Sequence, residues 1–132
     1  MKKQGILNSE ISSVLSYMGH MDTIAIGDCG LPIPEGVKRI DLALTFGEPG
    51  FLRTLELVLA DMKVEKFILA EETLRENPEI TARIGAMFDP QVETQTVPHA
   101  VFKEYTKRCK AVIRTGEATP YANIILQAAC IF

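Results

Sequence analysis

Short apolar segments alternate with segments of helical period along this chain, and that alternation limits its fold more than any other feature. Extended segments are expected at residues 23–27, 37–44, 66–70, 92–97, 111–114 and 123–132. Helices are expected after a cap at Asn8 or Ser9, over 49–62, over 71–88 with a break at Pro78, and after Pro98. Strands separated by helices favour an α/β domain whose mostly parallel or mixed central sheet has helices on both faces, a three-layer α/β/α arrangement.

The end of the chain departs from this pattern. Only residues 115–122 separate the last two extended segments, whereas a parallel return needs a longer crossover. The final strand is therefore expected to pair antiparallel. A length of 132 residues suits a single domain, so residues 1–132 are expected to fold as one unit.

Composition and charge exclude several classes of protein. Apolar residues make up 47% of the chain, which is too many for a disordered protein. The 14 Lys and Arg against 17 Asp and Glu give a net charge of −3, so no nucleic-acid partner, which needs a basic face, is expected. No run of about 18 apolar residues is present, so no membrane-spanning helix is expected.

The cysteines and the N-terminal residues bear on compartment and metal binding. Cys29, Cys109 and Cys130 are far apart and form no CxxC pair, which argues against a disulfide framework and against a zinc site. Only two histidines, His20 and His99, are present as metal ligands. Two lysines near the N-terminus precede no apolar signal-peptide core. We therefore expect a reduced, cytoplasmic protein without a metal ion.

The two histidines are the first candidates for proton transfer near neutral pH. His20 lies between an expected helix end at Gly19 and an apolar strand, on the kind of connection where functional side chains concentrate. Asp22 and Asp28 are its candidate partners. A lone histidine is more often structural or solvated, and His99, near a helix start, is equally compatible with a ring in solvent.

Polar residues that follow two of the expected strands are the next candidates. Asp28 ends a strand and opens a Gly/Pro-rich loop, and ligands of open α/β sheets bind outside the carboxyl ends of strands. In the stretch 114–123, Tyr121 can lay its ring against a sugar, and Asn123 can both donate and accept hydrogen bonds. The alternatives are a turn residue bonding its own backbone and an ordinary turn. The Glu71-Glu72 pair is interpreted as the first turn of a helix rather than an acid/base pair.

The spacing of His20 and Asp28 limits where a shared ligand can lie. The eight-residue step between them is mostly strand and spans roughly 25 Å if straight. One small ligand cannot contact both side chains within a single straight strand. Either the strand ends curl back, or His20 of one copy meets Asp28 of another. We expect the second arrangement, a site shared between subunits.

Motifs spread over the whole chain resemble those of one family. They are found at 5–9 (GILNS), 19–23 (GHMDT), 28–34 (DCGLPIP), 39–44 (RIDLAL), 111–117 (AVIRTGE) and 120–126 (PYANIIL). Together they are similar to the motifs of the RbsD/FucU-like family of small sugar mutarotases, which includes ribose pyranases and fucose mutarotases. Cys29 stands where the usual family sequence has alanine.

The resemblance implies an intramolecular isomerase that interconverts pyranose and furanose forms of D-ribose without a metal or cofactor. It implies His20 as the catalytic proton donor and the following substrate-binding residues: Asp28, His99, Tyr121, Ala122 and Asn123. It also implies a ring-built homo-oligomer, a decamer or an octamer, with sites between neighbouring subunits.

Ring interconversion needs only proton transfer, and a positioned acid/base contributes about 10²–10⁴-fold to such a step. Histidine suits that role. The sequence leaves three alternatives open. They are a non-catalytic sugar-binding or regulatory module on the same pocket, a mutarotase acting mainly on fucose or another monosaccharide, and a small metal-dependent isomerase.

Overall fold

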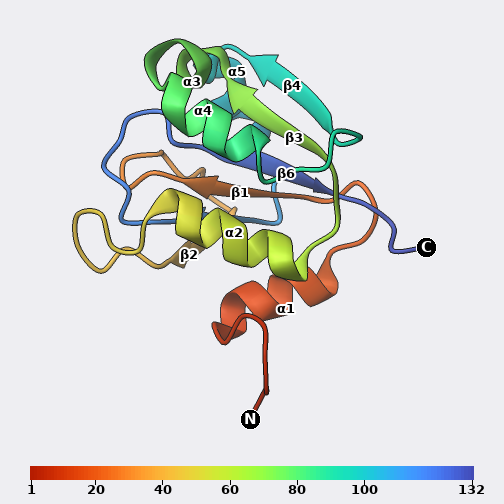
Figure 1. The fold of residues 1–132 in the computed structure, drawn as a ribbon. Coiled ribbons are helices and arrows are strands. Elements are labelled where there is room, and N and C mark those ends of the chain that lie inside the picture. The colour runs from red at the N-terminus through yellow and green to blue at the C-terminus, as the bar shows by residue number, and fades with distance from the viewer.

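A six-stranded mixed sheet forms the centre of the computed structural model, which describes all residues, 1–132 (Figure 1). Its strands are β1 (Thr23–Gly27), β2 (Lys38–Asp41), β3 (Val64–Ala70), β4 (Glu93–Val97), β5 (Ala111–Arg114) and β6 (Ile124–Ala128). They lie in the order β2-β5-β1-β6-β3-β4. The pairs β2–β5, β5–β1 and β3–β4 are parallel, whereas β6 is antiparallel to both of its neighbours. The prediction of a mixed α/β sheet is confirmed.

Helices cover both faces of the sheet. They are α1 (Ser9–Tyr17), α2 (Phe51–Asp61), α3 (Glu71–Glu76), α4 (Pro78–Gly85) and α5 (His99–Thr106). Side chains alternate between the faces of a strand, so Ile24 and Ile26 of β1 pack with α1, α2 and α4 in the larger core cluster. Ala25 faces the other way, toward a smaller cluster that contains Phe102 of α5. Figure 1 shows α1 and α2 on one side of the sheet and α5 on the other.

The position of β6 differs from the expectation. Its antiparallel direction is confirmed, but β6 pairs with β1 and β3 rather than with β5, its predecessor in the chain. The connecting residues cross the carboxyl end of β1, where the Thr115 N–H donates to the Gly27 carbonyl (3.0 Å) and the Cys29 N–H donates to the Glu117 carbonyl (2.8 Å). This crossing carries the chain past β1 before β6 begins.

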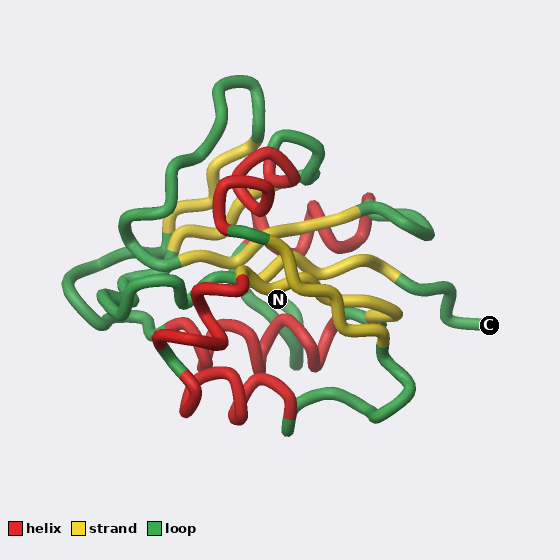
Figure 2. The backbone as a smooth tube through the Cα atoms, turned by 90° about the horizontal axis from the view of Figure 1, so that it is seen from above, coloured by secondary structure: helices red, strands yellow, loops and turns green.

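Several element boundaries also differ. The segment expected as a strand over 37–44 ends at Asp41, because its partner β5 ends opposite it at Arg114. Leu44 beyond it is 85% exposed. The helix expected from residue 49 begins at Phe51 after a Gly50 N-cap. The strand expected over 123–132 covers only β6, and the residues after it extend away from the body (Figure 2).

Other boundaries agree with the sequence. The break expected at Pro78 is confirmed, because Asn77 separates α3 from α4 there. The backbone N–H of Asn77 closes α3 on the Thr73 carbonyl, and Pro78 then opens α4 at its first position. None of the five helices has the length and apolar character needed to cross a lipid bilayer.

Candidate active site

A cavity of about 300 Å³ opens where β1 ends and where the 115–123 crossing approaches β6. Three parts of the chain line it, namely residues 28–32, the first residue of α5 (His99), and part of the stretch 117–123. Of the residues singled out in the sequence, this cavity brings together Asp28, His99, Tyr121 and Asn123. Ala122 does not line this cavity, because its side chain is fully buried in the hydrophobic core.

Asp28 is held by two hydrogen bonds to a buried partner. The Asn123 amide donates to Oδ2 of Asp28 (3.0 Å), and Oδ1 of Asn123 accepts from the Asp28 N–H (2.8 Å). The Gly30 N–H donates to Oδ1 of Asp28 (2.9 Å), which is the turn bond foreseen as the alternative role. Asn123 is 1% exposed, so this pairing fixes the Asp28 carboxylate at the wall of the cavity.

Tyr121 forms part of the cavity wall and has an unusual backbone conformation. Its φ of 63° lies in the left-handed region, which costs a non-glycine residue on the order of 1 kcal/mol. The Thr73 hydroxyl donates to the Tyr121 carbonyl (2.7 Å), and the Asn77 amide donates to the carbonyl of Pro120. These bonds from α3 and its C-cap hold the conformation in which the Tyr121 ring lies nearly perpendicular to the His99 ring, with ring centroids 5.1 Å apart.

His99 lines the cavity, and one nitrogen of its ring has no hydrogen-bond partner in the protein. Its Nδ1 is buried and has no hydrogen-bond partner among the protein atoms. Burial and, second, the nearby Lys103 lower the pKa of His99 below its ordinary value, although Glu72 and Asp28 oppose the shift. The ring is therefore neutral at pH 7, with one nitrogen able to donate a hydrogen bond and the other able to accept one.

Two glutamates that the sequence analysis did not assign to the site help to build it. The Glu71-Glu72 pair does begin α3, as expected, and the Glu72 carboxylate also accepts from the His99 N–H (2.8 Å). Hydrogen bonds from its own N–H and from that of His99 outweigh desolvation and lower the pKa of Glu72.

Glu117, the second of these glutamates, accepts from the Phe51 N–H at the start of α2 (3.2 Å) and from Thr119 (2.9 Å). Desolvation raises the pKa of Glu117, but these bonds reverse the shift and lower it.

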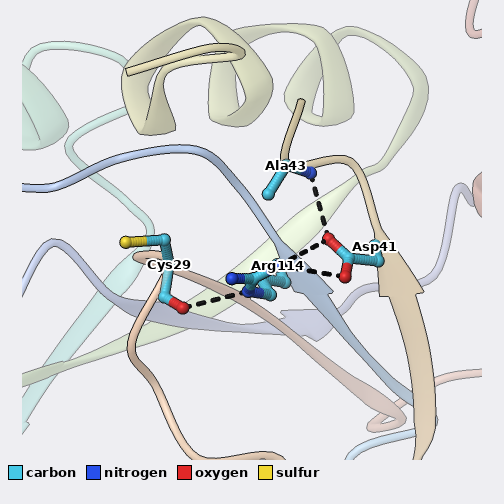
Figure 3. A network of polar contacts seen from close by, with 4 residues as sticks. All are labelled: Cys29, Asp41, Ala43 and Arg114. Atoms are coloured by element: carbon cyan, nitrogen blue, oxygen red, sulfur yellow. Dashed lines mark hydrogen bonds and ion pairs between the residues drawn. The ribbon is translucent and has the colours of Figure 1, made fainter. Parts of the chain in front are cut away.

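A charged pair fixes the loop that follows Asp28 (Figure 3). Arg114 of β5 and Asp41 of β2 are opposite in register, and Nη1 of Arg114 donates to both carboxylate oxygens of Asp41 (3.2 and 3.0 Å). Nε of Arg114 donates to the Cys29 carbonyl (2.9 Å), and the Ala43 N–H donates to Asp41 (3.0 Å). The side chain of Arg114 thus ties the cavity wall to the sheet edge. In the sequence, Arg114 is recognisable only as the first residue of the polar stretch 114–123.

His20 lies away from this cavity, at the opposite end of β1. Its Nε2 is 2.9 Å from Oε2 of Glu65 on β3, and its side chain is 50% exposed. Gln127 of β6 donates to the other Glu65 oxygen (2.7 Å). Hydrogen bonds from Gln127 and, second, His20 lower the pKa of Glu65. Within one chain, the five residues of β1 therefore separate His20 from Asp28.

The whole chain matches known proteins. Residues 1–131 match the model of a family described as the RbsD / FucU transport protein family. A D-ribose pyranase from Bacillus cereus is 58% identical over 133 residues, and one from Bacillus mycoides is 57% identical, each match covering 100% of both chains.

Solved structures match the fold as well. RbsD of Bacillus subtilis complexed with D-ribose superposes with a TM-score of 0.96 at 48% identity, over 100% of both chains. A fucose mutarotase from Streptococcus pneumoniae, in complex with L-fucose, shares the fold with a TM-score of 0.76 at 20% identity, over 99% of this chain and 100% of that one. This chain belongs to the RbsD / FucU family.

Proposed function

We propose that this protein is a D-ribose pyranase, which interconverts the pyranose and furanose forms of D-ribose by acid/base-catalysed opening and closure of the ring. The observation that carries the proposal is the convergence of Asp28, Asn123, His99 and Tyr121 on one small cavity. Relatives named D-ribose pyranase at 57–58% identity, and a ribose-bound structure of the same fold, support ribose as the sugar.

Each of the four side chains suits a different part of a monosaccharide. The Asp28 carboxylate, fixed by Asn123, accepts hydrogen bonds from sugar hydroxyls. The neutral ring of His99 donates or accepts, and the Tyr121 ring offers an apolar face to the C–H side of the sugar. A volume of about 300 Å³ is at the lower limit of small-molecule sites, which suits a single sugar ring.

The reaction itself needs a group that moves a proton. The anomeric hydroxyl gives up its proton, and C1 forms a carbonyl. The bond from C1 to the ring oxygen breaks, and that oxygen keeps the electron pair and takes up a proton. Attack by a different hydroxyl then closes the other ring. We assign the proton transfer to His20, whose side chain is half-exposed in this chain.

The separation of His20 from the cavity supports a site shared between copies. His20 of one subunit would complete the cavity that contains Asp28 of a neighbour, in a ring-built homo-oligomer such as a decamer or an octamer. The three free cysteines suit the reducing cytoplasm, which we propose as the compartment.

Saturation-transfer NMR between the pyranose and furanose signals of ribose tests the proposal. The wild-type protein is expected to exchange the two forms faster than buffer alone, and His20→Ala to fall to the buffer rate while still binding ribose. A wild-type rate equal to that of buffer would refute the proposed enzymatic activity. Full activity in His20→Ala would refute the assignment of His20.

One observation favours a second candidate, a sugar-binding or regulatory module without catalysis. The cavity of a single chain already contains its binding groups, whereas His20 lies outside it. A module of this kind would bind ribose and leave its exchange rate unchanged. The same NMR exchange measured with fucose and other monosaccharides identifies the preferred sugar.

A further inference from the structure

His20 lies on a tight turn that the neighbouring strand holds in place. The Asp22 N–H donates to the Gly19 carbonyl (3.1 Å), and the Gly19 N–H donates to the Asp22 carboxylate (2.9 Å). Met21 has a positive φ of 70° and donates its N–H to the Ala128 carbonyl at the end of β6 (3.0 Å). The backbone on either side of His20 is therefore fixed, and the orientation of the ring depends on its side-chain partner.

That partner, Glu65, occupies an irregular position in β3. Lys66 pairs with Gln127 and Val64 pairs with Ala128, so two steps along β3 correspond to one step along β6. Glu65 is the extra residue of this bulge. Bulges turn a side chain away from its regular direction, and they occur often beside active sites. Here the bulge brings the Glu65 carboxylate between Gln127 and His20.

The hydrogen bonds define the roles of the two ring nitrogens of His20. The Glu65 carboxylate can only accept, and one of its oxygens already accepts from the Gln127 amide. Its other oxygen therefore accepts from Nε2–H of His20, which leaves Nδ1 as the hydrogen-bond acceptor of the neutral ring. The nearby Asp22 is paired with Lys110 (3.3 Å), and His20 is the only basic side chain paired with Glu65.

We propose that Glu65 is a positioning residue of the ring-opening reaction, which fixes the His20 tautomer so that Nδ1 exchanges the proton with the sugar, and that Gln127 holds Glu65 in place. This inference rests on the proposed function, in which His20 moves that proton. When Nδ1 takes up a proton, the bond from Nε2–H to Glu65 becomes charge-assisted, which stabilises the cation formed during the reaction.

Glu65→Gln tests the role with almost no change in shape. A glutamine side chain can accept from or donate to the ring, so it no longer selects one tautomer. We expect ¹⁵N NMR of the imidazole to show mainly Nε2–H in the wild type and a mixture in Glu65→Gln. We expect kcat to fall on the order of 10-fold, with KM within about twofold, because the change affects proton transfer and not sugar contacts.

Two further variants complete the design. Gln127→Leu removes the donor to Glu65 and is expected to lower kcat in the same direction. The matched control is Glu56→Gln, which neutralises a glutamate of α2 that is likewise in an ion pair, with Arg53 (2.6 Å), and is expected to keep wild-type kinetics.

The outcomes separate the inference from the proposed function. Wild-type kcat or an unchanged tautomer in Glu65→Gln, together with an inactive His20→Ala, would overturn the positioning role alone. An active His20→Ala would overturn the proposed proton transfer and the positioning role with it. A reduced kcat, an altered tautomer and a normal KM in Glu65→Gln support the inference.

Discussion

The buried pair of Asn123 and Asp28 predicts a specific pH dependence for Asn123→Asp. In the native pair the Asn123 amide donates to Oδ2 of Asp28 (3.0 Å) and its oxygen accepts from the Asp28 N–H (2.8 Å). An aspartate at position 123 keeps the acceptor and places a second carboxylate against Oδ2. Asn123 is 1% exposed, so water screens the two charges poorly.

The size of the effect follows from Coulomb's law. Two unit charges on the order of 4 Å apart, at an effective dielectric constant of about 20, repel by about 4 kcal/mol. The folded variant avoids this cost by keeping one shared proton, which corresponds to a pKa raised by about 3 units. When the pKa of a carboxyl is raised on folding, the protein loses folding stability as the pH rises, here from about pH 4 to about pH 7. Relative to wild type, the loss in free energy of unfolding is thus about 1.5 kcal/mol at pH 5 and about 4 kcal/mol at pH 8.

Urea unfolding at both pH values measures this loss, at one fixed protein concentration because association shifts apparent stability. Asn123→Leu is the control, since it removes the hydrogen bonds without adding charge, and its loss is expected to be the same at pH 5 and pH 8. Combining Asn123→Asp with Asp28→Asn exchanges the two side chains and is expected to restore stability at pH 8. A single variant as stable as wild type at pH 8, or a double variant no more stable than the single one, would refute this reasoning.

Three further predictions concern the cavity wall. In Gly27→Ala the new Cβ lies 2.6 Å from Cδ2 of Leu31, which is too close for two carbon atoms. The free energy of unfolding, measured in urea, is therefore expected to fall by about 1–3 kcal/mol, and an unchanged value would contradict the close packing. Asp41→Asn weakens the ion pair with Arg114 that holds the loop after Asp28. Because the pair is partly exposed, KM for ribose is expected to rise only about 3-fold, with kcat unchanged. An unaltered KM would refute the role of the pair. Because burial lowers the pKa of His99, ribose affinity is expected to stay constant from pH 8 to about 6.5 and to fall below it as the ring is protonated, as calorimetric titration can show. His99→Gln is expected to remove this pH dependence. A wild-type affinity that already falls between pH 8 and pH 7 would be inconsistent with a lowered pKa of His99.

Local sequence signals predicted the elements better than their arrangement. Short apolar runs and the Pro78 break identified the strands and helices, because burial and backbone restrictions act locally. The place of β6 between β1 and β3 depends on how residues 115–123 cross the end of β1, and such a crossing leaves no periodic pattern. The alternation of apolar residues over 37–44 continued past Asp41, but the strand ends where its partner β5 ends.

The site shows the same division between local and long-range information. Asp28, Tyr121 and Asn123 were found because each follows or precedes a strand in a polar loop. Their mutual contacts join residues as many as 95 positions apart, which no spacing rule reveals. Glu65 lies inside a strand, and its contact with His20 depends on a bulge that the sequence does not mark.

Mixing two inactive variants tests most directly the central claim that one active site takes His20 from one copy and Asp28 from another. His20→Ala and Asp28→Ala are each expected to leave ribose exchange at the buffer rate. In hybrid oligomers co-expressed at equal levels, each site draws its two residues from neighbouring copies at random, so about a quarter of the wild-type rate is expected to return. Exchange at the buffer rate in folded, assembled hybrids would contradict the shared site.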